Sequence, residues 1–249
     1  MDYQEPRFFY LRIFLYLTLT SINFIISYSP VVLTFSWIFI DDFSLNILTV
    51  QFWVVLFSPV ILFLVYLSGW AVFVLIHSKI ICPFFLVPIK PGHYPLSKNI
   101  TKLLAIRVSA DQTTRMMLTP LDFMPLIVNR YLRPFFLRCY GVKVGKNVYF
   151  SRDNKVDASP LIEIGDNIIV GQLSVISCHF IAKQELVLDK VFIGHNVTIG
   201  DYAIILPGAI LQNNIVIGPK AIVPKKHLED GITFYHQPAI EMASTHELY

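Results

Sequence analysis

The sequence is poor in charged residues. Lysine, arginine, aspartate and glutamate make up only 15% of its 249 residues, whereas hydrophobic residues make up 55% and the mean hydropathy is +0.59. Because a soluble globular domain usually carries about 25% charged residues, this composition excludes one average soluble domain. The apolar excess lies almost wholly before residue 90. The sequence therefore predicts a membrane part followed by a water-facing part.

Cysteine is scarce as well. Cys82, Cys139 and Cys178 show no paired spacing, which argues against a disulfide framework and a zinc site and fits a reducing compartment. The sequence also lacks a run of basic residues interleaved with aromatic ones, so its net charge of +3 does not indicate a nucleic-acid partner. Membrane lipids are the expected partner of the positive charge.

Two stretches contain no charged side chain, Ile13–Ile40 and Phe43–His77. Each is longer than the roughly 20 residues that cross a hydrocarbon layer, so we predict a transmembrane helical hairpin within residues 1–80. The first stretch is too long for a signal peptide, whose apolar core has roughly 7–15 residues. The alternative is a buried helical hairpin inside a large soluble core.

The flanking charges predict an orientation. Two arginines precede the first stretch, five basic residues from Lys79 to Arg107 follow the second, and the connection carries Asp41 and Asp42 with no basic residue. Basic residues favour the cytoplasmic side of a membrane. We therefore predict an integral membrane protein whose termini and water-facing part are both cytoplasmic.

Residues 81–140 are predicted to connect the two parts. Four prolines within residues 80–95 indicate an irregular connector at the level of the lipid headgroups. From Ser97 to Arg138 the pattern becomes helical and rich in arginine, and Thr119 followed by Pro120 resembles the start of a helix. These helices either lie along the membrane interface or pack only against the following domain.

The stretch Val191–Lys226 repeats with a period of six. Aliphatic residues occupy the same position of every block, namely Ile193, Ile199, Ile205, Leu211, Ile217 and Val223. Neither an amphipathic helix nor an alternating strand has this period, whereas a parallel β-helix of hexapeptide repeats does. We predict such a β-helix over residues 141–242 and a tail over residues 243–249, with the aliphatic residues pointing into a buried column.

The repeat is interrupted twice. The register is lost in the segment SRDNKVDASP, residues 151–160, and again between His179 and Lys190. We expect roughly four coils with two excursions, and excursions from a solenoid are where function concentrates. The chain is expected to leave the register from His227 onward, and Pro238–Met242 to start a short closing helix.

The repeats and their surroundings resemble two groups of proteins. The order of Ser177–His179, a loop, two Ile-Gly blocks, a Pro-Gly block and a final Val-Pro-Lys resembles hexapeptide-repeat acyltransferases of the maltose and xenobiotic acetyltransferase type. The segments KPGHYPL (residues 90–96), TPLDF (119–123) and IEIGDN (162–167) resemble the membrane-embedded terminal region of nonribosomal peptide synthetases of the polylysine synthetase type.

The resemblance implies a left-handed β-helix that assembles as a homotrimer and binds acyl-CoA, in the first place acetyl-CoA, in the cleft between subunits. It also implies that His179 is the catalytic base, because imidazole accepts a proton near neutral pH. The alternative is a histidine that fills a corner. Asp157 and Glu163 could orient His179 or simply face solvent, and Cys178 is expected to be a packed thiol because neighbouring strand residues point to opposite faces.

For the coenzyme, the resemblance implies a role for Lys225 at the nucleotide phosphates and for Gly218, Lys220 and Ala221 along the pantetheine arm. The alternative for the lysines is a solvated edge. His195 has no second histidine close by in the chain after it, so no metal is expected.

Together these features predict a membrane-anchored acyltransferase that moves an acyl group from acyl-CoA to a hydroxyl or amine. The acceptor is expected to be lipid-linked, a glycan or a peptide. The alternative is a non-catalytic trimeric scaffold, or a binding or transport module for a peptide or lipid-linked product.

Overall fold

The protein divides into two compact units in the computed structural model. The described residues are 6–39, 50–85, 88–108, 128–157, 159–225, 227–235 and 240–244. One unit is Arg7–Phe85, and the other comprises Leu86–Tyr249 together with Met1–Pro6. The helix start predicted at Thr119 and Pro120 lies outside the described residues.

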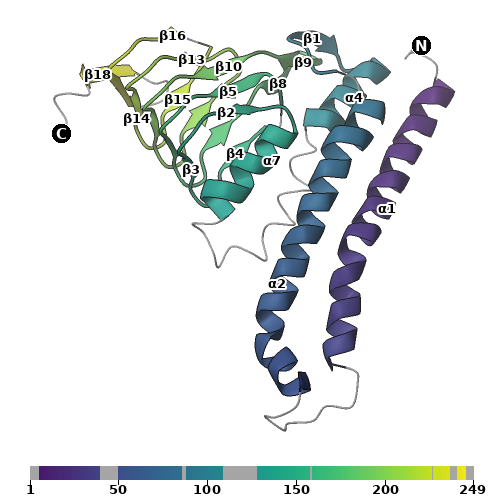
Figure 1. The fold of residues 1–249 in the computed structure, drawn as a ribbon. Coiled ribbons are helices and arrows are strands. Elements are labelled where there is room, and N and C mark those ends of the chain that lie inside the picture. The colour runs from purple at the N-terminus through teal and green to yellow at the C-terminus, as the bar shows by residue number, and fades with distance from the viewer. Residues whose placement is uncertain are drawn as a thin grey trace. The chain divides into compact units, whose positions relative to one another are not determined.

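Two long helices form the first unit (Figure 1). They are α1 (Pro6–Phe39) and α2 (Val50–Ile76), and α2 continues into the π-helix η1 (His77–Ile81) and the short α3 (Cys82–Phe85). Pro30 lies inside α1 and Pro59 inside α2, and both helices are continuous. The two charge-free stretches therefore form the two helices that the sequence predicts.

The two helices run antiparallel and approach closely. Asn23 Nδ2 donates a hydrogen bond to Phe73 O at 3.1 Å, and a Cβ added to Gly69 would lie 2.4 Å from the backbone oxygen of Ser27. Only glycine fits such a contact, which is typical of helices packed through small residues. The buried Asn23 amide adds a polar contact between helices that are otherwise apolar.

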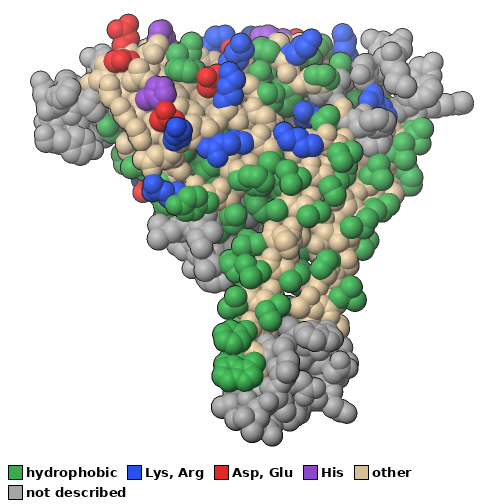
Figure 2. Space-filling view, in the orientation of Figure 1, with side chains coloured by type: hydrophobic (Ala, Val, Ile, Leu, Met, Phe, Trp, Pro, Cys, Tyr) green, Lys and Arg blue, Asp and Glu red, His purple; other side chains and the backbone are tan. Residues whose placement is uncertain are grey.

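Both helices are long and apolar enough to cross a membrane. The spans that meet this criterion of length and composition are Phe9–Ser36 and Leu56–Ile81, and only 17% and 22% of their most apolar windows are buried. Phe14 and Leu33 are 64% and 68% exposed on α1. Figure 2 shows apolar side chains along the visible face of this unit.

Within its described residues, the second unit begins with four short elements. These are β1 (Gly92–Pro95), α4 (Asn99–Val108), the π-helix η3 (Val128–Leu132) and α7 (Arg133–Cys139). The sequence predicts an irregular connector where β1 forms. The strand is missed because its hydrogen-bonding partner lies some ninety residues further along the chain, as the pair Pro95 and Glu185 shows.

Three parallel sheets form the solenoid (Figure 1). One sheet has the order β16-β13-β10-β5-β2, a second β15-β12-β7-β4, and a third β18-β17-β14-β11-β6-β3, in which only β18 is antiparallel. The strands are β2 (Lys143–Val144), β3 (Val148–Phe150), β4 (Lys155–Val156), β5 (Ile162–Ile164), β6 (Ile168–Val170), β7 (Val175–Ile176), β10 (Val191–Ile193), β11 (Thr198–Ile199), β12 (Ile204–Ile205), β13 (Ile210–Leu211), β14 (Val216–Ile217), β15 (Ile222–Val223), β16 (His227–Leu228), β17 (Ile232–Tyr235) and β18 (Ile240–Ser244).

The aliphatic column is confirmed. All six residues predicted to point inward, from Ile193 to Val223, are at most 1% exposed. Each pairs in register with its counterpart on a neighbouring coil, as Ile199 does with Ile217. Burying one such side chain contributes about 1.5–3 kcal/mol, so the column is the main source of stability in this unit.

A ladder of asparagines runs down one corner of the solenoid. Asn147, Asn167, Asn196 and Asn214 each adopt a left-handed backbone with φ between 56° and 58°. The amide Nδ2 of each of the first three donates to the Oδ1 of the asparagine on the next coil at 3.0–3.1 Å. Asparagine tolerates this backbone better than other non-glycine residues, and the stacked amides satisfy one another along the corner.

Helix α7 closes the N-terminal end of the column. Phe136 and Leu137 are each 1% exposed. The buried Arg133 guanidinium donates to the backbone oxygen of Asn154 and lies 5.3 Å from the centroid of the Phe150 ring. A solenoid needs such a cap because its first coil otherwise exposes apolar side chains.

Two segments that are predicted to leave the stack remain in it. Residues 151–160 do not leave the stack, because β4 pairs in parallel with β7 and Val156 is 1% exposed. The polar residues around β4 conceal this repeat, and the true irregularity is two extra residues before β5. The chain also stays in the stack after His227, since β16 pairs with β13 and β17 with β14. Four complete coils result, as expected.

The excursion between His179 and Lys190 is a β-hairpin. β8 (His179–Ala182) and β9 (Glu185–Leu188) are antiparallel, and β1 extends them to a sheet of order β1-β9-β8. Lys183 and Gln184 form the turn with φ of 48° and 63°, the pattern of a type I′ turn.

The closing element is a strand. Ile240–Ser244 forms β18, which pairs antiparallel with β17. The short helix predicted from Pro238 is therefore wrong over these residues. The antiparallel strand pairs with the edge of the last strand, and this long-range pairing is invisible to a local pattern.

Candidate active site

One corner of the solenoid carries the candidate chemistry. Asp157, His179, Gly208 and Lys225 follow the four strands β4, β7, β12 and β15 of a single parallel sheet. Neighbouring strands of a sheet lie about 4.8 Å apart, so the backbone at Lys225 is two coils, or about 10 Å, from that near His179. The structure therefore brings two of the predicted site residues to the same corner.

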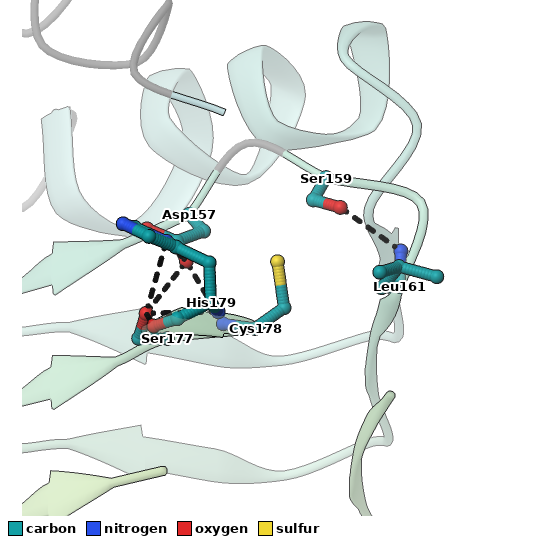
Figure 3. Close-up of polar contacts among 6 residues, drawn as sticks. All are labelled: Asp157, Ser159, Leu161, Ser177, Cys178 and His179. Carbon is teal, nitrogen blue, oxygen red and sulfur yellow. Dashed lines mark hydrogen bonds and ion pairs between the residues drawn. The ribbon is translucent and has the colours of Figure 1, made fainter. Parts of the chain in front are cut away.

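His179 and Asp157 form the centre of this corner (Figure 3). His179 Nδ1 lies 2.6 Å from Asp157 Oδ2, with the two side chains 34% and 16% exposed. A carboxylate only accepts hydrogen bonds, so Nδ1 carries the proton and Nε2 of the neutral ring keeps its lone pair. This is the tautomer that a general base requires.

Asp157 is itself held in place. Its Oδ2 accepts hydrogen bonds from the Cys178 backbone N–H and from the Ser177 hydroxyl, both at 2.8 Å. The Ser177 hydroxyl also lies 2.8 Å from the carbonyl oxygen of His179, so its single hydrogen has two acceptors. A base oriented by a carboxylate that is oriented in turn follows the logic of catalytic triads.

The hydrogen bond that His179 Nδ1 donates to Asp157 raises the pKa of His179 above its ordinary value, and burial opposes part of this increase. The carboxylate stabilises the protonated imidazole, because a negative charge at hydrogen-bond distance favours the cation. His179 is therefore a stronger base than a solvated histidine, and it is neutral over a correspondingly higher range of pH.

Glu163 is not the partner of His179. It lies on β5, where its Oε2 is paired with Lys143 Nζ at 2.9 Å on an exposed face. The sequence offers both carboxylates, and only the fold distinguishes them. The sequence assigns no role to Ser177, although the resemblance includes it in the stretch Ser177–His179.

Cys178 is a packed thiol, as expected. It is fully buried, and in Figure 3 its sulfur points away from the His179 ring. Burial is the main cause that raises the pKa of this thiol, with the nearby charge of Asp157 adding to the effect. A neutral buried thiol does not act as a nucleophile.

Lys225 is paired with an acid that the sequence analysis does not consider. Its Nζ lies 2.7 Å from Asp189 Oδ2, and this ion pair lowers the pKa of Asp189. The pair passes over Gly208, where an added Cβ would lie 2.7 Å from Lys225 Cγ and 2.9 Å from Asp189 Oδ2. The Asp189 backbone N–H also donates to Cys178 O at 3.0 Å, which ties the ion pair to the segment that carries His179.

The other predicted coenzyme residues lie at a different corner. Gly218, Lys220 and Ala221 connect β14 to β15, at the opposite end of β15 from Lys225. Ala221 is fully buried, and Lys220 is exposed with φ of 61°. A Cβ added to Gly200 would lie 2.7 Å from the carbonyl carbon of Gly218, so close coil stacking alone accounts for small residues here.

His195 belongs to a third corner. Its ring Nδ1 accepts a hydrogen bond from the Asp166 backbone N–H at 3.0 Å. The backbone N–H of His195 donates to Asn213 Oδ1 at 2.7 Å. It therefore has a structural role between coils. Among the residues that the structure describes, no group of three His, Cys, Asp or Glu side chains could hold a metal ion.

The fold and this corner define a class: a parallel β-helix of hexapeptide repeats with a histidine and a carboxylate paired after two neighbouring strands. The chain is similar to hexapeptide-repeat acetyltransferases, which have been solved repeatedly. No family model matches the chain.

Two curated relatives are each 29% identical to part of the chain. The delta-poly-L-ornithine synthetase of Acinetobacter baumannii matches over 104 residues, which are 42% of this chain and 8% of that protein. The galactoside O-acetyltransferase of Escherichia coli aligns over 106 residues, and the match covers 39% of this chain and 52% of that protein. The chain thus spans about half of one relative and less than a tenth of the other.

Two solved structures are similar to part of the chain. The maltose O-acetyltransferase of Clostridium difficile is 20% identical with a TM-score of 0.46, and the match covers 62% of this chain and 92% of that one. A hexapeptide-repeat acetyltransferase of Vibrio cholerae in complex with acetyl coenzyme A is 16% identical with a TM-score of 0.43, and the match covers 58% and 89%.

Proposed function

We propose that this protein transfers an acyl group, most simply acetyl, from acyl-CoA to a hydroxyl or amine, with His179 as general base. The observation that supports this proposal is the 2.6 Å contact between His179 Nδ1 and Asp157 Oδ2. It fixes the tautomer and leaves Nε2 on a partly exposed ring to receive a proton. The acetyltransferase relatives add support from outside the chain.

In the proposed reaction, Nε2 takes the proton of the acceptor as its oxygen or nitrogen attacks the thioester carbonyl. A C–O or C–N bond forms and the C–S bond breaks. The coenzyme leaves as a thiol after the imidazolium returns the proton to sulfur. The raised pKa of His179 suits both steps, because the same group first accepts and then donates a proton.

The coenzyme is proposed to meet Lys225 and Lys220 through its phosphates and to pass Gly218 and Ala221. Both lysines are exposed and can reach a phosphate. Lys225 is held by Asp189, so a phosphate would share or replace that partner. Ala221 is buried, so only the backbone beside it can face a ligand.

The same proposal includes the handedness of the solenoid, its assembly, its membrane anchor and its acceptor. The solenoid is proposed to be left-handed and to form a homotrimer, since closed cyclic symmetry buries flat faces simply. The helical hairpin is proposed to anchor it in a membrane, with both termini and the β-helix in the cytoplasm. The acceptor is proposed to be lipid-linked, a glycan or a peptide.

The test uses the full chain in lipid nanodiscs with acetyl-CoA. Binding is measured by calorimetry and turnover by release of the coenzyme thiol to small alcohols and amines. We expect His179→Ala to bind acetyl-CoA normally and to lose turnover. His195→Ala is the matched control, because His195 is also a corner histidine beside an acid, at 3.5 Å from Asp166.

Two results would contradict the proposal. Failure of the wild-type chain to bind acetyl-CoA would leave the non-catalytic trimeric scaffold as the better account. Equal turnover in wild type and His179→Ala would contradict the assignment of His179 as the general base. The mass of the protein in detergent tests the trimer independently, and a monomer would contradict it.

A further inference from the structure

The strand that begins at His179 is unusual for a sheet edge. β8 is an outer strand of the sheet β1-β9-β8, and the three residues after His179 are Phe180, Ile181 and Ala182. All three are exposed, with Phe180 at 42% and Ile181 at 62%. Sheet edges are normally protected by charged or bulged residues. An uncharged, apolar edge beside a candidate base therefore needs a reason other than solubility.

The pairing of β8 with β9 shows which of these side chains share a face with His179. His179 pairs with Leu188, Phe180 with Val187 and Ile181 with Leu186. Side chains alternate between the faces of a strand, so Ile181 stands on the face of His179 and Phe180 on the other. Leu186, the partner of Ile181, is 1% exposed. Ile181 is thus the open end of an apolar row next to the base.

The distance between the two side chains follows from the strand. Two residues of extended chain separate His179 from Ile181, which is about 6.6 Å along β8. An alkyl chain of roughly five or six carbons covers that distance. A molecule whose hydroxyl or amine meets His179 Nε2 therefore brings an apolar group of that size against Ile181.

We infer that Ile181 is a specificity-determining residue, and that the acceptor of this site carries an apolar group about 6–7 Å from the hydroxyl or amine that is acylated. This inference rests on the proposed function, because it takes the acceptor to meet His179. It selects amphiphilic acceptors over fully polar ones.

The test measures acetyl transfer from acetyl-CoA to two series of probes, unbranched primary amines and primary alcohols of two to eight carbons. The protein is the full chain in nanodiscs, and the rate with His179→Ala is subtracted. For wild type we expect kcat/KM to rise roughly tenfold from two to six carbons, as apolar area is buried against Ile181, and to level off beyond.

Ile181→Ser is expected to flatten the dependence of kcat/KM on chain length. The rate with the two-carbon probes should stay within about twofold of the wild-type rate, a change smaller than the usual effect of losing a buried apolar contact. Phe180→Ser is the matched control, since it removes an exposed apolar side chain from the same strand but from the opposite face. Both variants partition the probes into lipid equally. Thermal unfolding of all variants verifies that they are folded.

The outcomes separate the two proposals. A length dependence that survives in Ile181→Ser, or that disappears equally in Phe180→Ser, overturns the role of Ile181 and leaves the acyltransferase standing. Rates that do not depend on chain length in wild type overturn the inference in the same way. No transfer above the His179→Ala rate with any probe overturns the proposed function itself, and the inference with it.

Discussion

Asp157 and His179 lie 22 residues apart in the chain, yet their side chains meet at 2.6 Å because both follow strands of one parallel sheet. The Cys178 backbone N–H and the Ser177 hydroxyl donate to the same carboxylate oxygen, Asp157 Oδ2, and hold it in place. The pair is therefore a product of the register between the first and second coils.

Asp157→Asn is expected to lower kcat by about 10²- to 10⁴-fold with little effect on the KM for acyl-CoA. An amide can turn its NH₂ toward Nδ1 and favour the tautomer that has its proton on Nε2. Steady-state kinetics with acetyl-CoA provide the measurement. Glu163→Gln is the control, because Glu163 pairs with Lys143 on an exposed face, and a loss of similar size in that variant would argue against a specific role for Asp157.

The pH profile should report the raised pKa of His179. Only neutral imidazole is a base, so kcat/KM should rise with pH along a limb centred above the ordinary histidine value of about 6.5. In Asp157→Asn the residual activity should show this limb at lower pH, because the hydrogen bond that raises the pKa is gone. A limb at the same pH in both proteins would contradict the assignment.

The same shift predicts a dependence of stability on pH. A pKa that is raised in the folded state stabilises the protein fully below the unfolded value, and this contribution is lost as pH rises through the folded value. The difference in unfolding free energy between wild type and Asp157→Asn should accordingly shrink as the pH rises from about 6 to about 8. This range brackets the ordinary pKa of histidine. Denaturant titrations at several pH values measure it, and a difference that grows with pH would contradict the sign.

Lys225→Met should raise the KM for acyl-CoA about tenfold and leave kcat nearly unchanged, the effect of losing one charge-assisted contact to a phosphate. Calorimetric titration with CoA should show the same change. Lys143→Met is a fair comparison, since it also removes an exposed lysine that is paired with an acid. Equal affinity in the two variants would leave Lys225 as a purely structural partner of Asp189.

The hairpin turn offers a stabilising change. Lys183 and Gln184 both have positive φ, which costs a residue with a Cβ roughly 1 kcal/mol or more. Replacing them by Asn and Gly, the favoured residues of a type I′ turn, should raise the free energy of unfolding by about 1 kcal/mol. Thermal unfolding would show it, while Gln184→Ala, which keeps the strain, should change nothing. A lower melting temperature in the Asn-Gly variant would refute the turn type.

Gly69→Val should disrupt the helical hairpin. The new Cβ would approach the Ser27 backbone oxygen to 2.4 Å, and overpacking of this kind costs about 2 kcal/mol or more. Helicity and thermal unfolding in detergent are the measurements. Ser68→Val changes the adjacent, exposed position and should be tolerated, so a similar loss in both variants would mean that the contact with Ser27 is not the cause.

Much of the fold follows from local pattern. From Ile193 to Val223, the side chain at every sixth position is buried in the solenoid. Few folds have a period of six residues. Val156 obeys the same period but was missed, since the polar residues around it make the block look like a loop. β1 and β18 were missed for another reason, because each is a strand only by virtue of a distant partner.

The candidate site was predictable only in part. His179 was found through its place before an excursion and through a resemblance, and Lys225 through its place at the end of the repeats. The choice of Asp157 over Glu163 depends on which corner each occupies, and two extra residues between β4 and β5 decide that. Asp189 lies on the excursion, where no period operates, so its contact with Lys225 could come only from the fold.

The asparagine ladder has a final consequence for how this site can change. Where neither an excursion nor an extra residue intervenes, equivalent corner residues such as Asn196 and Asn214 are 18 residues apart, and the ladder holds each coil to its neighbour in one register. The spacing between His179 and Lys225 is therefore quantised. It can lengthen only by insertion of a whole coil, which moves Lys225 by one step of about 4.8 Å, and a shorter insertion must bulge outward as a loop. The coil spacing therefore sets the length of the site, which spans two coils of the solenoid.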